Sequence, residues 1–136
     1  MLYNKFMKKL SEKKRFSLVA RGKSIANAFR GISIVVRSTH NLWVHIFFAI
    51  VVICFGFLFN ISSLEWIAVI FSIGLVFITE TINTSIEIDI DLTSPNYHPY
   101  ARDTKDIAAG AVLISCVVAV IVGLIIFLPK VLVLSF

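Results

Sequence analysis

The sequence predicts an all-α integral membrane protein, with three transmembrane helices and an amphipathic helix before them. Of its 136 residues, 58% are hydrophobic and only 15% are charged, a balance that is rare in soluble domains. Three stretches carry no formal charge: 27 residues after Arg37, 14 after Glu65 and 23 after Asp106. Since a helix needs about 20 apolar residues to cross a bilayer, the first and third stretches suffice alone. The second is too short, so a helix there can cross the membrane only if it includes the polar residues that follow.

The N-terminal part of the chain is typical of a helix that lies on the membrane surface. Residues 1–16 are a basic segment without strong periodicity. In residues 17–38, apolar side chains recur at helical spacing from Ile25 to Val36, and basic side chains, Arg30 among them, lie on the opposite side. This pattern predicts an amphipathic interfacial helix, which either anchors the protein or handles its substrate.

Three spans follow, within what we interpret as a single domain, 1–136. We expect them at 41–60, 64–91 and 106–130, separated by a short polar turn and by a loop that holds two of the three prolines. The residues that can cap these helices are Ser62 or Ser63 for the second span and Asp103 or Thr104 for the third.

The basic residues indicate which way the chain crosses the membrane. Ten of the thirteen Lys and Arg precede residue 38, and Arg102 and Lys105 lie in the connection between the second and third spans. The positive-inside rule therefore predicts that the N-terminus and this connection are cytoplasmic. The net charge of +5 fits membrane orientation and anionic lipid better than nucleic acid, which we do not expect as a partner.

The polar end of the second span is the most informative stretch. The segment ETINTSIEIDID, residues 80–91, holds four carboxylates. Asp89 points away from the other three. A carboxylate inside a membrane helix costs about 2.5 to 3.5 kcal/mol, so such a face is a functional hypothesis by default. At about 100° per residue, the residues that share one helix face are Glu80, Asn83, Thr84, Glu87 and Asp91.

Spacing alone leaves three interpretations of this acidic face open: a cation site, a transport path and a solvated surface. Magnesium commonly takes one or two carboxylates together with phosphate oxygens, and a carboxylate beside apolar surface can serve as a base for a hydroxyl. The sequence has no Gly-rich nucleotide loop followed by Lys-Ser or Lys-Thr, and no Ser-His-Asp pattern. Cys54 and Cys116 both lie in apolar runs and are best interpreted as packing residues.

Five segments together carry a family resemblance: AFRGI, NLWVH and SSLEW, then NTSIEIDID and YHPYARDTKDIAAGAVL. Over roughly residues 17–130 the chain resembles the small prokaryotic lipid kinases of the diacylglycerol kinase and undecaprenol kinase family. The resemblance implies a homotrimeric helical bundle in the bacterial inner membrane, with its active site on the cytoplasmic side. It also implies transfer of the γ-phosphoryl group of ATP, with Mg²⁺, to the hydroxyl of diacylglycerol or undecaprenol.

The resemblance further implies a role for each residue of the site. Glu80 is expected to be the general base, Asn83 and Arg30 to bind the lipid substrate, and Glu87 to carry Mg²⁺ and thereby ATP. The other residues expected at the nucleotide are Asn27, Asp91, His98, Lys105 and Asp106.

One position departs from the family pattern. Where relatives commonly place a second metal-binding Glu, six residues before His45, this chain has Thr39. A neutral hydroxyl is a poorer magnesium ligand than a carboxylate. The sequence therefore also admits an alternative, a non-catalytic membrane protein on the same scaffold, either a pseudokinase or a small transport subunit.

Overall fold

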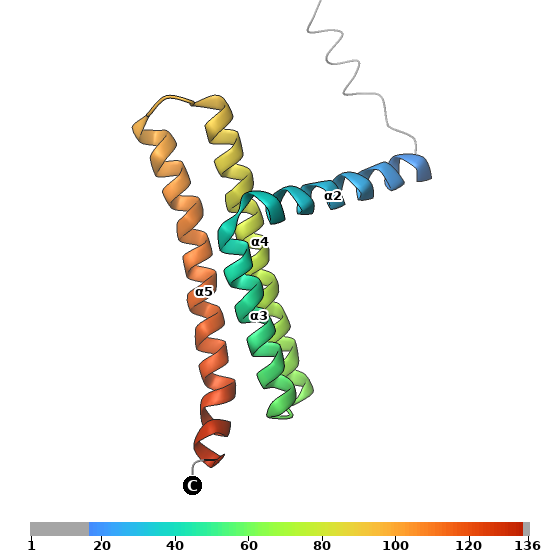
Figure 1. Cartoon of the computed structure of the whole chain (residues 1–136), viewed down its shortest axis with the longest axis vertical. Helices are drawn as coiled ribbons and strands as arrows, with labels where there is room; N and C mark the ends of the chain where they lie inside the picture. Colours follow the sequence, from blue (N-terminus) through green and yellow to red (C-terminus); the bar gives the residue numbers. More distant parts are fainter. Residues whose placement is uncertain (1–16, 135–136) are drawn as a thin grey trace, which may run out of the picture. The chain divides into compact units, whose positions relative to one another are not determined.

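The computed structural model describes residues 17–134, and every regular element in that range is an α-helix (Figure 1). The basic segment 1–16 lies outside the described residues. The chain forms two compact units, which divide between Ser33 and Ile34. The all-α prediction is confirmed.

The first unit is represented by most of α2, Leu18–Ser38. Its apolar residues Ile25, Phe29 and Ile32 share one helix face and are 59%, 66% and 57% exposed. Such a face gains free energy when the interfacial region of a membrane covers it, as the amphipathic pattern predicts.

A tight turn joins the first two spans of the second unit. The first span, α3, covers His40–Leu58, and the next helix, α4, begins at Ser63. Asn60 lies in the turn with a φ of 46°, a left-handed conformation that asparagine adopts more readily than most residues. We call this end of the bundle the turn end.

The start of α4, Ser63–Thr93, is fixed by a capping box. The Ser62 hydroxyl accepts a hydrogen bond from the Glu65 amide at 3.4 Å, and the Glu65 carboxylate accepts one from the Ser62 amide at 2.6 Å. Ser62 is therefore the cap, rather than Ser63. Lys130 adds an ion pair to the same Glu65 carboxylate, with Nζ 3.0 Å from Oε1.

The third span begins earlier than the sequence pattern predicts. The helix α5 covers Pro99–Leu134, so the expected start at 106 and the expected caps, Asp103 or Thr104, all lie inside the helix. Proline suits the first helical position because its missing N–H has no partner there in any case. The loop between α4 and α5 is correspondingly short, and we call this end of the bundle the loop end.

The helices α3, α4 and α5 are each long and apolar enough to cross a membrane. They run side by side in the second unit, with α4 and α5 in contact along much of their length (Figure 1). At the turn end, Ile61, Val69 and Ile126 form a buried apolar cluster. The prediction of three transmembrane helices is confirmed, and the chain is an integral membrane protein.

Candidate active site

The acidic face of α4 becomes more buried from the loop end toward the middle of the helix. Asp91 is exposed and Glu87 is half-buried. The three residues that lie deepest are Glu80, Asn83 and Thr84, at 1%, 5% and 3% exposed. Asp89, which the helical spacing placed on the other side, is exposed. Because the helix turns its acids toward protein and away from lipid, solvated surface is a poor description of its deep end.

Glu80 is the most enclosed acid in the described part of the chain. Its Oε1 atom is buried and has no hydrogen-bond partner among the described residues. Its Oε2 atom lies 3.9 Å from Nε2 of His45, on α3. A buried carboxylate oxygen without a donor is costly, so this position is kept for something other than stability.

The contact with His45 was not predicted from the sequence. In the sequence, His45 has no metal-ligand spacing and lies 35 positions before Glu80. Only the packing of α3 against α4 brings the two side chains together, and no local pattern encodes that contact.

Asn83 and Glu87 form the next layer of the site. The Asn83 amide nitrogen donates a hydrogen bond to Glu87 Oε1 at 2.9 Å, one helical turn away. This bond orients both side chains. The Asn83 oxygen, Oδ1, is buried and has no partner among the described residues. Two unpaired oxygen acceptors, on Glu80 and Asn83, therefore lie within one turn of helix.

Thr39 is held against the same face of α4. Its hydroxyl lies 2.9 Å from the Thr84 hydroxyl, which donates to the Glu80 carbonyl oxygen at 2.9 Å. A hydroxyl has one proton to give, so Thr84 accepts from Thr39 when it bonds that carbonyl. The hydroxyl of Thr39, its only side-chain donor, thus links the start of α3 to α4.

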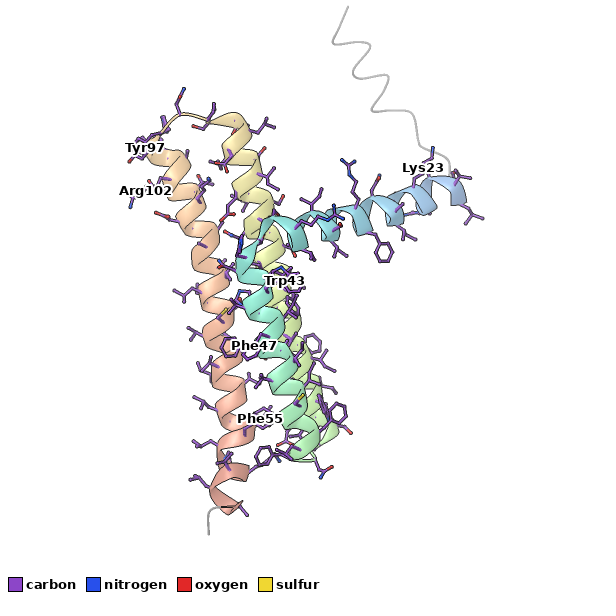
Figure 2. All side chains as sticks on the ribbon, in the orientation of Figure 1. Lys23, Trp43, Phe47, Phe55, Tyr97 and Arg102 are labelled. Carbon is purple, nitrogen blue, oxygen red and sulfur yellow. The ribbon has the colours of Figure 1, made fainter. Side chains whose placement is uncertain are left out.

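A polar pocket lies at the loop end, with a volume of about 300 Å³. In it Lys105 Nζ lies 2.5 Å from Asp91 Oδ1, and Arg102 Nε lies 3.5 Å from Asp106 Oδ2. Figure 2 shows Tyr97 and Arg102, two more of its residues, at the end where α4 and α5 are joined. Four residues expected at the nucleotide therefore come together here, namely Asp91, His98, Lys105 and Asp106.

The two remaining residues of the predicted site are Asn27 and Arg30. Both belong to the first unit, where they lie at exposed positions of α2. Their expected roles stay predictions.

The donor set at Glu87 fits a magnesium ion that keeps most of its water. Among residues 17–134, no three His, Cys, Asp or Glu side chains lie close enough to cage a metal ion. Magnesium does not need such a cage, since it commonly binds one or two carboxylates and takes its other ligands from water and phosphate. Glu87 supplies a carboxylate and Asn83 an unpaired amide oxygen, both of the hard oxygen type that magnesium prefers.

A carboxylate that protein helices enclose at membrane depth generally marks a functional site, because it is too costly to retain without a use. Fold and site therefore define an integral membrane protein with an acidic site held among its own helices. Comparison with known proteins gives the family. The family described as Prokaryotic diacylglycerol kinase matches residues 26–127, and the chain belongs to that family of lipid kinases.

Individual relatives agree with this assignment. The chain is 43% identical over 108 residues to an undecaprenol kinase of Bacillus subtilis, which covers 79% of this chain and 88% of the relative. It is 36% identical over 110 residues to a diacylglycerol kinase of Synechocystis, covering 80% and 63% of the two chains. A diacylglycerol kinase of Escherichia coli is 33% identical over 78 residues, covering 57% and 62%. The chain thus spans just under two thirds of the length of these two diacylglycerol kinases. Membership of a kinase family implies ATP as the phosphate donor.

Proposed function

We propose that this protein transfers the γ-phosphoryl group of ATP, with Mg²⁺, to the hydroxyl of a membrane lipid, either diacylglycerol or undecaprenol. The observation that carries the proposal is Glu80, a carboxylate that is 1% exposed and has one oxygen without a partner. A lipid hydroxyl is the donor that this oxygen lacks. The names of the relatives, which include both an undecaprenol kinase and diacylglycerol kinases, support both acceptors.

In this mechanism Glu80 is the general base. It takes the proton of the lipid hydroxyl as the hydroxyl oxygen attacks the γ-phosphorus, and the bond between that phosphorus and ADP breaks. The products are a lipid phosphate and ADP, and the proton resides on Glu80 until water or His45 removes it. Proton transfer of this kind typically contributes 10² to 10⁴-fold to the rate.

Glu87 is the residue that would hold magnesium in this mechanism, and Asn83 beside it would contact the lipid substrate. When bound, the ion neutralises negative charge on the phosphate oxygens, which is most of what phosphoryl transfer requires. The hydrogen bond between Asn83 and Glu87, 2.9 Å long, orients the carboxylate before substrates arrive. Glu87 lies nearly two helical turns closer to the loop than Glu80, so the ion and the base serve opposite sides of the transferred group.

The pocket at the loop end is proposed to hold ATP. Lys105 and Arg102 supply positive charge there, and each is paired with an acid before ATP binds, Asp91 and Asp106 respectively. Triphosphate oxygens can compete for both cations. The proposal also assigns an adenine-side contact to Asn27 and a lipid contact to Arg30, both on α2.

The assembly and location are part of the same proposal. We place the protein as a homotrimer in the bacterial inner membrane, with its N-terminus and active site on the cytoplasmic side and with residues 1–136 as one lipid kinase domain. Two of its three Lys or Arg residues beyond position 37 lie at the loop end, which supports this orientation.

The test is direct phosphorylation. Purified protein in mixed micelles is given labelled ATP, Mg²⁺ and either diacylglycerol or undecaprenol, with an active family member as the positive control. Label in either lipid supports the proposal. If the control labels lipid and this protein labels neither, the non-catalytic alternative that Thr39 raised replaces the kinase.

A further inference from the structure

After each turnover Glu80 holds a proton that has to leave before the next lipid can react. The Glu80 side chain is 1% exposed, and its Oε1 atom is buried without a partner among the described residues. Bulk water therefore cannot take the proton from this oxygen directly. A neighbouring side chain has to carry the proton to the surface of the protein.

The polar neighbours of Glu80 on α4 do not offer such a route. The Thr84 hydroxyl already donates to the Glu80 carbonyl oxygen and bonds Thr39. Asn83 presents an amide, which has donors and an acceptor but does not titrate. Glu87 lies seven positions further along the helix, about 10 Å along its axis, so the two carboxyl groups cannot share a hydrogen bond.

The other two helices each bring one titratable side chain close to Glu80. The helix α5 places Cys116 within electrostatic range of it, but a thiol keeps its own proton at neutral pH and cannot accept another. The helix α3 contributes His45, whose Nε2 atom lies 3.9 Å from Glu80 Oε2. An imidazole accepts and releases protons near neutral pH. Among residues 17–134, His45 is therefore the one neighbour of Glu80 that can take its proton.

His45 also reaches toward water. It lies five residues into α3, about 7.5 Å from the start of that helix at His40. Because α3 ends at the turn, its start lies on the same side of the bundle as the loop end. The His45 side chain is 17% exposed, whereas the Glu80 side chain beside it is enclosed. The imidazole thus lies between a buried carboxylate and the surface.

We infer that His45 removes the proton from Glu80 after each phosphoryl transfer and passes it to water. The inference rests on the proposed kinase function. In this step the O–H bond of protonated Glu80 breaks and an N–H bond forms at Nε2 of a neutral His45, so Glu80 becomes a carboxylate again. The resulting imidazolium then gives one proton to water. The separation of 3.9 Å is longer than a hydrogen bond, and a small side-chain rotation or a bridging water closes it.

The first experiment separates turnover from substrate binding, because His45 acts through Glu80 and does not touch the substrates. We expect His45→Ala and His45→Gln to lower kcat about tenfold or more, with KM for lipid and for ATP within about twofold of wild type. Glutamine fills most of the space of the ring, so a loss common to both variants does not arise from an empty space. The inference is wrong if kcat is unchanged in both variants, or if KM rises while kcat is kept.

A matched control and two small molecules sharpen this experiment. Phe48→Ala, three positions along α3, opens space in the same groove that His45 lines, and should change kcat less than about threefold. Imidazole added to His45→Ala should restore kcat about fivefold or more, whereas pyrazole, a ring of the same size but a much weaker base, should not. Wild type and Phe48→Ala should respond to neither. Equal restoration by both rings would mean that the ring only fills space, and would overturn the inference.

A second experiment needs neither ATP nor a lipid, so its failure and that of the kinase proposal can be told apart. Protein at a pH that protonates Glu80 is mixed rapidly with D₂O, and the infrared C=O band of this carboxyl group is followed as deuterium replaces its proton. The band is identified by its loss in Glu80→Gln. We expect His45→Gln, but not Phe48→Ala, to slow the exchange about tenfold or more. Slower exchange supports the inference even if no lipid is phosphorylated, and an equal rate in His45→Gln and wild type overturns it even if phosphorylation occurs.

Discussion

Two acids on the same helix, Glu65 and Glu80, show how differently a glutamate can be used at the start of a helix and in its middle. At the turn end, Glu65 accepts the Ser62 amide and pairs with Lys130, so both of its oxygens have partners. In the middle of α4, Glu80 has one oxygen with no partner and another 3.9 Å from His45. The first acid stabilises the start of a helix, whereas the second has a buried oxygen without a partner, which the proposed mechanism assigns to the lipid hydroxyl.

The largest expected effect follows from replacing the incomplete acid. Glu80→Gln keeps the size of the side chain and removes the base, so we expect kcat to fall about 10² to 10⁴-fold. Thermal stability should stay the same or rise, because an unpaired buried charge is lost. The measurements are lipid phosphorylation and a melting curve of the purified variant. A large loss of stability would place Glu80 with Glu65 as a structural acid.

Glu87→Gln tests the neighbouring layer of the site. We expect a loss of about 10²-fold at a fixed Mg²⁺ concentration, part of it recovered at higher Mg²⁺, because an amide is a weaker ligand than a carboxylate. The assay is phosphorylation across a Mg²⁺ titration. The matched control is Asp89→Asn, two positions along on the exposed side of α4. If Asp89→Asn costs as much as Glu87→Gln, the assignment of the acidic face is wrong.

Glu65→Ala should produce the opposite result to Glu80→Gln. It removes a capping-box partner and leaves Lys130, which is 29% exposed, without its carboxylate. We expect unfolding to become easier by about 1–2 kcal/mol, seen as a lower Tm, with activity per folded molecule within twofold. If a Glu65 variant keeps the wild-type Tm but loses phosphorylation, Glu65 is not a purely structural acid and the contrast with Glu80 is wrong.

The smallest expected effect is at Thr39. Thr39→Glu adds a carboxylate near the site at the cost of the hydrogen bond to Thr84, and should lower the Mg²⁺ concentration for half activity about threefold. Thr39→Val, which loses the same bond without adding charge, is the control and should leave this concentration unchanged. An equal Mg²⁺ requirement in Thr39→Glu and wild type would show that position 39 does not face the ion.

The fold was largely predictable because each transmembrane helix depends on residues that are neighbours in the sequence. The uncharged stretches and the Ser62 to Glu65 cap predict helices from local spacing alone. The start of α5 was missed because Pro99 was interpreted as part of a loop, whereas proline also favours the first turn of a helix.

The site was predictable only along one helix. Helical spacing places Glu80, Asn83 and Glu87 on one face, and the structure agrees that Asn83 and Glu87 are in contact. Helical spacing cannot predict contacts between two helices. The contacts of His45 with Glu80 and of Thr39 with Thr84 are of this kind. The missing partner of Glu80 Oε1 is likewise a property of packing.

Because the turn between α3 and α4 is tight, the depth of the Glu80 carboxylate in the membrane depends on the thickness of the bilayer. α3 has 19 residues, or about 28 Å of helix, which nearly matches a hydrocarbon core of about 30 Å and leaves no length to spare. The short turn fixes the start of α4 beside the end of α3. Glu80 lies about 26 Å along α4 from Ser63, so it lies near the far edge of that core. In a thicker bilayer the carboxylate would sink below the headgroups and away from ATP, and in a thinner one it would rise among them. Reconstitution into lipids of graded acyl-chain length should therefore give an optimum thickness for turnover.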